Sequence, residues 1–358
     1  MALDLDPGLG AVGNPALVKA IIEEMDGGAI PFERFMELAL YHPEHGYYRK
    51  PARIGTGGDF LTSPVIHPMF GWAAGAWCEW VWEGLGQPSP FTIIEPGAGE
   101  GALATSLLDW AEGRGGEFAE ALRYVAIEPN ARGSDTRIEW RDEAPPVAEA
   151  GVVLSNELFD ALPVRLFEVE GRGPVEVWVR WDGEAFVEAR GSIATIDGAP
   201  AAGRFEVNGR AHSTMLAMCD LVERGAVLTF DYGYPEEELW ADWRTQGTLL
   251  CFYRHTAHED PYRHVGEQDL TAHVNLSELE LAMELAGFTA FAPVTQAAFL
   301  TEAGLGGLVE RVRDDLPEYF ARRRAFQQLT DAAGLGRIRV LTGTCGLDGV
   351  PPGFGGAE

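Results

Sequence analysis

The residues with the clearest chemical potential are carboxylates placed around a glycine-rich turn. The segment Glu95-Pro96-Gly97-Ala98-Gly99-Glu100-Gly101 follows a short apolar run. Glycines let the backbone turn tightly and approach a bound ligand closely. A dinucleotide site usually has a GxGxxG turn that opens a helix aimed at a pyrophosphate, but here the third glycine comes one residue early. Two carboxylates beside a phosphate would repel it, so the turn suits a cofactor with an ammonium group and no phosphate.

S-adenosylmethionine has these properties, and a further carboxylate supports it. Glu128 ends the next apolar run, residues 122–128, where an acidic side chain can accept hydrogen bonds from two ribose hydroxyls. A glycine turn of this form, followed by an acidic end to the second strand, is typical of class I methyltransferases. An accidental structural turn and an NAD site are the alternatives. We expect the following residues to bind the cofactor: Glu95, Gly97, Ala98, Gly99, Gly101 and Glu128.

A second polar block follows the third apolar run, residues 151–156. It reads Asn156-Glu157-Leu158-Phe159-Asp160-Ala161-Leu162-Pro163, and it lies where open α/β sheets bind their ligands, at the carboxyl edge. We expect Asn156 both to hold the methionine end of the cofactor and to take part in catalysis, and we expect Glu157 and Asp160 to face the methyl acceptor. The alternative is a helix cap with exposed acids.

Two other blocks carry weaker signals. The loop Gly57-Gly58-Asp59-Phe60-Leu61-Thr62-Ser63-Pro64 could close over a ligand, although ordinary turns use the same residues. From this loop we expect Gly58, Asp59, Phe60 and Thr62 to contact the cofactor. The block Asp269-Leu270-Thr271-Ala272-His273-Val274-Asn275 supplies His273 as a candidate catalytic base, with a structural loop as the alternative.

Histidines also occur three residues apart, at His42 and His45 and at His255 and His258. Pro43 interrupts a helix face in the first pair and no cysteine lies beside either pair, so we expect no metal site. The sequence leaves open whether His255 and His258 have a role. GxSxG, P-loop and HExxH motifs are missing from the sequence, which argues against hydrolase and NTPase chemistry.

The elements that must position these blocks alternate between strand and helix. Apolar, β-rich runs at residues 91–95, 122–128, 151–156 and 226–231 predict strands of a parallel sheet covered on both faces. Helical spacing is found at residues 15–40, 68–84, 101–111, 277–288 and 305–330. We attribute the aromatic stripe of residues 69–82 to packing, and expect the last helices to cap the sheet. Alternating valines in the segment 164–209 predict antiparallel hairpins.

The sequence therefore predicts an α/β protein with an insertion. We expect an N-terminal helical cover at residues 1–88 and a methyltransferase domain at residues 89–163 and 210–345. The insertion covers residues 164–209 and contains strands and helix. Residues 346–358 are rich in glycine and proline, which predicts a flexible tail.

The charge balance limits the partners. The chain of 358 residues has 27 basic and 55 acidic residues, a net charge of −28. This field repels phosphate backbones and anionic lipid, so we expect neither nucleic acid nor membrane insertion. Solubility alone could explain the acidity, and a basic protein segment could exploit it. The four cysteines are scattered, no apolar run reaches membrane-spanning length, and the first residues lack a secretory pattern. We expect a cytoplasmic setting.

Together the blocks resemble the MidA-like family of S-adenosylmethionine-dependent methyltransferases, which includes the mitochondrial complex I assembly-factor methyltransferase. The resemblance extends from about residue 14 to residue 343 and also includes these blocks: Phe230-Asp231-Tyr232-Gly233 and Thr295-Gln296-Ala297-Ala298-Phe299-Leu300. It implies a Rossmann-like class I methyltransferase sheet with an N-terminal helical cover and an inserted subdomain. It also implies methylation of a protein arginine, with a respiratory complex I subunit as one candidate substrate.

Methyl transfer from a sulfonium requires the acceptor, methyl and sulfur to be collinear. An arginine acceptor also needs a carboxylate that orients the guanidinium and takes up a proton, for which Glu157 and Asp160 are the candidates. One alternative is methylation of a small-molecule hydroxyl or amine with His273 as the base. Another is a non-catalytic assembly factor that keeps the cofactor pocket for stability. The sequence is compatible with a monomer or a homodimer.

Overall fold

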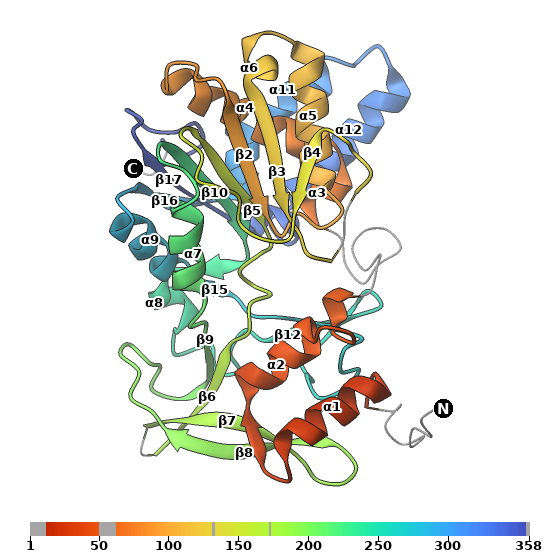
Figure 1. The fold of residues 1–358 in the computed structure, drawn as a ribbon, viewed down its shortest axis with the longest axis vertical. Helices are drawn as coiled ribbons and strands as arrows, with labels where there is room; N and C mark the ends of the chain where they lie inside the picture. Colours follow the sequence, from red (N-terminus) through yellow and green to blue (C-terminus); the bar gives the residue numbers. More distant parts are fainter. Residues whose placement is uncertain (1–11, 50–61, 131–132, 172, 356–358) are drawn as a thin grey trace. The chain divides into compact units, whose positions relative to one another are not determined.

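The computed structural model describes residues 12–49, 62–130, 133–171 and 173–355 (Figure 1). The chain forms two compact units, which are described separately. The sheet unit comprises Leu61–Leu158, His212–Gly233 and Leu276–Glu358. The hairpin unit comprises Met1–Phe60, Phe159–Ala211 and Tyr234–Asn275.

A seven-stranded sheet forms the centre of the sheet unit, with the strand order β16-β17-β10-β5-β2-β3-β4. Its strands in this order are β16 (Thr289–Thr295), β17 (Arg339–Cys345), β10 (Gly225–Asp231), β5 (Gly151–Asn156), β2 (Phe91–Pro96), β3 (Leu122–Ile127) and β4 (Ile138–Arg141). The five strands from β10 to β4 are parallel, and β17 is antiparallel to both of its neighbours. The four predicted strands are therefore confirmed as β2, β3, β5 and β10.

Three strands of this sheet, β4, β16 and β17, were not predicted. The C-terminal part, expected to cap the sheet, also contributes β16 and β17 to it. β17 lies inside the sheet, between β10 and β16. Its pattern is not apolar enough to indicate a buried strand, because Thr342 and Thr344 occupy buried positions. The Thr342 hydroxyl donates to the Val227 carbonyl at 2.7 Å, which satisfies a polar group that would otherwise be costly to bury.

Two helices pack closely because glycines line their contact. An ideal Cβ on Gly71 of α4 (Met69–Gly84) would lie 2.0 Å from Ser106 Oγ of α5 (Ala102–Arg114), and one on Gly75 would lie 2.6 Å from the Trp110 ring. Trp77 is 3% exposed within this helix layer, as expected for packing residues. The other helical elements of the unit are α3 (Ser63–Ile66), α6 (Glu117–Ala121), α7 (Ala211–Cys219), α9 (Leu276–Leu285), α10 (Gln296–Glu302), α11 (Leu305–Glu310), α12 (Leu316–Leu329) and η3 (Leu335–Arg337).

The segment expected to be a flexible tail contributes to the core where it is described. Phe354 is 8% exposed, and its ring lies 6.1 Å from that of Phe299 and 6.5 Å from that of Phe291. This aromatic contact holds the end of the described chain against the sheet unit.

The hairpin unit confirms the predicted antiparallel hairpins. Its larger sheet has the order β1-β7-β6-β9, and β8 pairs with β7 (Figure 1). The strands are β1 (Ala29–Pro31), β6 (Arg165–Glu170), β7 (Gly173–Trp181), β8 (Phe186–Ile193) and β9 (Gly203–Val207). A second sheet has the order β13-β12-β14, with β12 (Leu250–Tyr253), β13 (Thr256–His258) and β14 (Asp269–Thr271). The remaining elements are α1 (Pro15–Met25), α2 (Phe32–Tyr41), η2 (Tyr47–Arg49), α8 (Glu236–Leu239), β11 (Gly233–Tyr234) and β15 (Val274–Asn275).

The N-terminal helices α1 and α2 share a hydrophobic core with β6 and β7. Phe35 of α2 is fully buried, and its ring makes an edge contact with Phe186 of β8 at 5.1 Å. α3 and α4, in contrast, belong to the sheet unit. The functional domain boundaries expected from the sequence stay a prediction, because compact units group residues by contact only. Within the described residues, no helix is long and apolar enough to span a membrane.

Candidate functional site

The glycine turn between β2 and α5 has the backbone conformation that its composition predicts. Gly97, Gly99 and Gly101 have φ values of 71°, 53° and 80°, in the left-handed region that favours glycine. The Gly97 amide donates to the Ile127 carbonyl at 2.9 Å, and the Gly101 amide donates to the Ala98 carbonyl at 2.9 Å. An ideal Cβ on Gly99 would meet no atom of the described residues within 4 Å. The turn therefore leaves open space over Gly99, into which a ligand could approach the backbone.

Glu128 ties this turn to the end of β3. Its carboxylate accepts a hydrogen bond from the Gly99 amide at 3.2 Å and another from the Asn130 amide at 2.8 Å. The acidic residue that the sequence places at the end of the second strand is therefore in direct contact with the glycine turn.

Glu95 is buried beside the turn, in contrast to the exposed Glu100. Glu95 is 3% exposed, and its Oε2 accepts a hydrogen bond of 2.7 Å from the hydroxyl of Tyr124 on β3. Burial raises the pKa of Glu95 to about 8, although the Tyr124 hydrogen bond acts in the opposite direction and the negative charge of Glu128 acts in the same direction. The two carboxylates that flank the turn in the sequence thus have different environments.

The end of β5 brings an amide and a carboxylate to the same edge of the sheet. Asn156 Nδ2 donates to Glu157 Oε1 at 2.9 Å. Asn156 Oδ1 is buried and has no hydrogen-bond partner among the described residues. Glu157 has φ 51°, and its amide donates to the Phe230 carbonyl at 2.8 Å. A non-glycine residue in this conformation is uncommon and strained, and such residues are enriched at functional sites.

Leu158 connects this edge to the glycine turn. An ideal Cβ on Gly97 would lie 2.9 Å from Leu158 Cδ1, so the two segments are in contact. The Leu158 amide donates to Asp231 Oδ2 at 3.0 Å, and Asp231 is fully buried at the end of β10. The structure thus brings the glycine turn, Asn156 and Glu157 together at the carboxyl ends of β2 and β5.

Asp160 and His273 belong to the hairpin unit. Asp160 is 5% exposed, and its carbonyl accepts from the Ala272 amide at 2.9 Å. The His273 amide donates to Thr248 Oγ1 at 2.9 Å. The structure therefore places the Asp160 and His273 segments next to one another within this unit.

Two hydroxyl–carboxylate pairs were missed from the sequence. Tyr124 holds Glu95, and the Tyr48 hydroxyl donates to Asp269 Oδ1 at 2.8 Å, where Asp269 is 1% exposed. Tyr124 pairs with Ile93 in the register of β2 and β3. The available signal was a tyrosine in a largely apolar strand. It lies two positions before Ala126, which pairs with Glu95. The Tyr48–Asp269 contact joins residues far apart in the chain, and local pattern gives no sign of it.

Of the four loop residues expected to contact the cofactor, Thr62 is the one that the structure describes, and it is 7% exposed. Gly58, Asp59 and Phe60 lie outside the described residues. Within the described ranges, no three His, Cys, Asp or Glu side chains are grouped so that they could hold a metal ion.

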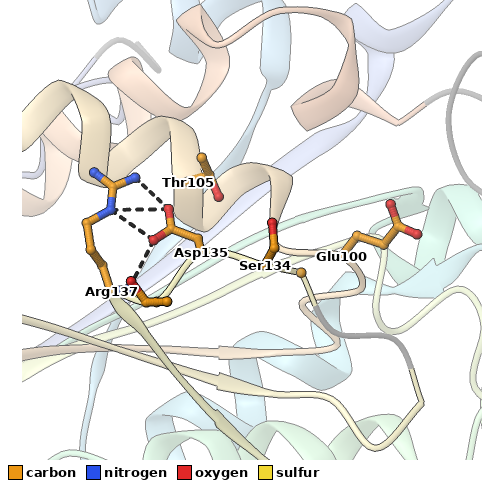
Figure 2. Close-up of a pocket in the computed structure, with 7 residues that line it drawn as sticks. Glu100, Thr105, Ser134, Asp135 and Arg137 are labelled. Atoms are coloured by element: carbon orange, nitrogen blue, oxygen red, sulfur yellow. Dashed lines mark hydrogen bonds and ion pairs between the residues drawn. The ribbon is translucent and has the colours of Figure 1, made fainter.

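A separate groove of about 770 Å³ lies beside α5 and the segment before β4 (Figure 2). Arg137 is prominent in it and bonds to Asp135, Asp109 and Glu112. The Arg137 hydrogen bonds lower the pKa of Asp135 to about 2. The guanidinium is surrounded by carboxylates, so we interpret this groove as a surface ion-pair network. Among the described residues, its lining includes Glu100 but none of those expected to bind the cofactor.

A parallel sheet with one inserted antiparallel strand, a glycine turn after β2 and an acid after β3 define a class I S-adenosylmethionine-dependent methyltransferase. The arrangement also fits this cofactor. Among the described residues, none fills the space over Gly99 and none bonds to the buried Asn156 Oδ1, and both features accommodate a ligand with amine donors.

Comparison with known proteins supports this class. Residues 73–294 match a family model described as S-adenosyl-L-methionine-dependent methyltransferase. A homolog of the mitochondrial protein arginine methyltransferase NDUFAF7 from Drosophila melanogaster is 26% identical, over 92% of this chain and 85% of that protein. NDUFAF7 from Danio rerio is 29% identical, over 82% of this chain and 77% of that protein.

A solved structure gives the same result. A protein from Burkholderia thailandensis, crystallised with bound S-adenosyl-homocysteine, is 32% identical with a TM-score of 0.87, over 96% of this chain and 95% of that chain. The present chain belongs to this family of S-adenosylmethionine-dependent methyltransferases, and S-adenosylmethionine is its cofactor. The resemblance to the MidA-like family is thereby confirmed.

Proposed function

We propose that this enzyme transfers the methyl group of S-adenosylmethionine to an arginine side chain of a protein. The names of the two curated relatives, both protein arginine methyltransferases, support this acceptor. The observation that carries the proposal is Glu157, a carboxylate in a strained left-handed conformation at the carboxyl end of β5, next to the glycine turn. A guanidinium has paired N–H donors that match a carboxylate.

The cofactor is assigned to the edge of the sheet formed by β2, β3 and β5. In this assignment Gly97, Ala98, Gly99 and Gly101 provide close backbone approach, and Glu128 accepts from ribose hydroxyls. Asn156 Oδ1, a buried acceptor without a partner among the described residues, receives the amine of the methionine end. Glu95, buried beside the turn, contributes negative charge when a cationic cofactor favours its ionised form. The sequence also predicts cofactor contacts for four further residues, and these stay predictions: Gly58, Asp59, Phe60 and Thr62.

The cofactor, when bound, supplies a methyl group on a sulfonium that leaves as S-adenosyl-homocysteine. The chain positions the acceptor. Glu157 orients the guanidinium so that one nitrogen faces the methyl carbon, and Asn156 Nδ2 fixes the carboxylate by its 2.9 Å hydrogen bond. As the N–C bond forms and the S–C bond breaks, the acceptor nitrogen gains positive charge and releases a proton. Glu157 accepts that proton. The expectation from the sequence that Asp160 also faces the methyl acceptor stays a prediction.

The net charge of −28 suits a basic substrate segment. A respiratory complex I subunit, which the family resemblance implies, is the first substrate to test. The cytoplasmic setting stays a prediction. It receives no support from the two curated relatives, because both are described as mitochondrial. Monomer and homodimer remain the expected oligomeric states.

The proposal is tested with S-adenosylmethionine that carries a labelled methyl group and a whole-cell protein extract. We expect label in a discrete protein band, on arginine after hydrolysis. Glu157→Gln should lower transfer at least about a hundredfold while calorimetry still detects cofactor binding. Glu120→Gln, which removes an exposed carboxylate on α6, is the matched control and should retain transfer.

Three results would contradict the proposal. Label only in the small-molecule fraction would favour a hydroxyl or amine acceptor, with His273 as the candidate base. Binding of the cofactor without any transfer would favour a non-catalytic assembly factor. Full transfer by both Glu157→Gln and Asp160→Asn would remove these carboxylates from the mechanism.

A further inference from the structure

The cofactor site contains a buried pair that the methyl-transfer step does not use directly. Glu95 ends β2, and Tyr124 lies on the neighbouring parallel strand β3. The two side chains are 3% and 2% exposed, and the Tyr124 hydroxyl lies 2.7 Å from Glu95 Oε2. A carboxylate removed from water in this way is costly to ionise unless a donor or a cation compensates it.

We propose that Tyr124 is a positioning residue of the cofactor site, whose hydroxyl holds the Glu95 carboxylate beneath the glycine turn and keeps it available as an anion for the cationic cofactor. This inference rests on the assignment of the cofactor to the glycine turn. It adds a residue that no sequence motif contains, and it makes cofactor binding depend on the protonation state of Glu95.

The surroundings of the pair determine the direction of that dependence. Glu95 is adjacent to the turn, which begins with Pro96 and Gly97. The charged or titratable groups that act on the pair are Glu128, at the end of β3, and Cys78 of α4, whose effect falls on Tyr124. The Glu128 carboxylate opposes additional negative charge here, whereas burial raises the pKa of the Cys78 thiol, so that it stays neutral. Tyr124 is the group that stabilises the Glu95 anion.

Binding of a cation is therefore coupled to release of a proton from Glu95. Burial raises the pKa of Glu95 to about 8, so the acid is largely protonated at neutral pH in the absence of ligand. A sulfonium or ammonium nearby favours the anion, so the affinity for the cofactor should increase as the pH rises through this range. Removal of the Tyr124 hydroxyl raises the pKa of Glu95 further and shifts the same increase to higher pH.

The experiment is calorimetric titration of the full chain with S-adenosylmethionine from about pH 6 to about pH 9.5. For Tyr124→Phe we expect an affinity at least about tenfold weaker at neutral pH, because a hydrogen bond to a charged group is lost. We also expect the pH at which the affinity is half-maximal to move upward by about one unit. Methyl transfer need not be measured, so failure of the proposed acceptor would not affect this result.

Two controls separate positioning from stability. Tyr262→Phe removes another tyrosine–glutamate hydrogen bond, 3.1 Å from the Tyr262 hydroxyl to Glu188 Oε1 in the hairpin unit, and should leave the pH profile unchanged. Glu95→Gln removes the titrating group, and in this background Tyr124→Phe should have little additional effect on affinity. The amine of the cofactor titrates at about pH 8 itself, so each profile is interpreted as its difference from that of Glu95→Gln.

The proposal is overturned if Tyr124→Phe binds within about twofold of the wild type across the range. It is equally overturned if Glu95→Gln binds the cofactor above pH 9 as tightly as the wild type does. If Tyr124→Phe does not fold, the affinity of Glu95→Gln is the test. If the wild-type protein binds no S-adenosylmethionine at all, the error lies in the cofactor assignment and not in the role of Tyr124.

Discussion

Gly99 offers the sharpest test of where the cofactor binds. Its φ of 53° is left-handed, and an ideal Cβ would meet no atom within 4 Å. Gly99→Ala therefore has a backbone cost without a clash inside the protein. An L-residue in this conformation costs about 1–2 kcal/mol, which for a domain of this size lowers the melting temperature by about 2–8 °C.

A matched control exists at Gly287, just after α9. Its φ is 85°, and an ideal Cβ would likewise meet nothing within 4 Å. Gly287→Ala should therefore lower the melting temperature by a similar amount. The two variants are expected to differ in ligand binding, because the added methyl group of Gly99→Ala projects from the glycine turn into space assigned to the cofactor.

Gly101 provides a contrast in the same turn. Its φ is 80°, and an ideal Cβ would lie 3.0 Å from the Trp140 ring and 3.2 Å from Ile138 Cδ1. Gly101→Ala should add an overpacking cost of about 1–3 kcal/mol to the backbone cost. Its melting temperature should therefore be lower than that of Gly99→Ala.

The assays are differential scanning calorimetry for stability and isothermal titration calorimetry with S-adenosylmethionine below the lowest melting temperature. Gly99→Ala should weaken cofactor binding at least tenfold, about 1.4 kcal/mol, while Gly287→Ala binds as the wild type does. Equal affinities in these two variants, at equal loss of stability, would show that the space over Gly99 is not where the cofactor lies.

Three other predictions concern stability. Burial raises the pKa of Glu95 to about 8, so Glu95 binds a proton in the folded state at pH values where the unfolded chain does not. The free energy of unfolding of the unliganded protein should therefore fall by up to about 1.4 kcal/mol per pH unit from about pH 4.5 to about pH 8. Urea titrations of Glu95→Gln should lack this slope. Tyr48→Phe removes the 2.8 Å hydrogen bond to buried Asp269 and should lower the free energy of unfolding by about 1–3 kcal/mol. Its control is Tyr253→Phe, which keeps its stacked ring and should be nearly neutral in the same unfolding assay. Gln296→Leu leaves the partners of a fully buried amide unsatisfied and should cost about 2–4 kcal/mol by thermal unfolding; no loss would mean that solvent or repacking replaces both bonds.

Much of the sheet unit could be predicted because its strands are local patterns. The run at residues 151–156 has an apolar centre of two valines and a leucine, and it forms β5 with those bounds. The glycine turn is also a local feature, since three left-handed residues in a short segment require glycine whatever the rest of the chain does. For this reason the cofactor class could be inferred from a few adjacent residues.

The division of the acceptor-side residues could not be predicted. Glu157 and Asp160 are three residues apart in the sequence, yet one belongs to the sheet unit and the other to the hairpin unit. Asp160 is fixed by backbone contact with Ala272, more than a hundred residues later. Which segments share a unit depends on such distant pairings, which a local pattern does not encode. The roles of Glu157 and Asp160 stay predictions.

The sequence by itself determined the alternation of strands and helices, the glycine turn and the acid after the second strand. These features follow from hydrophobic periodicity and from the φ values that a turn requires. Only the tertiary structure placed β17 between β10 and β16 and set the Tyr124 hydroxyl on Glu95. The physical reason is that strand order and buried hydrogen bonds depend on contacts between distant segments, whose side chains become neighbours only after the sheet has formed.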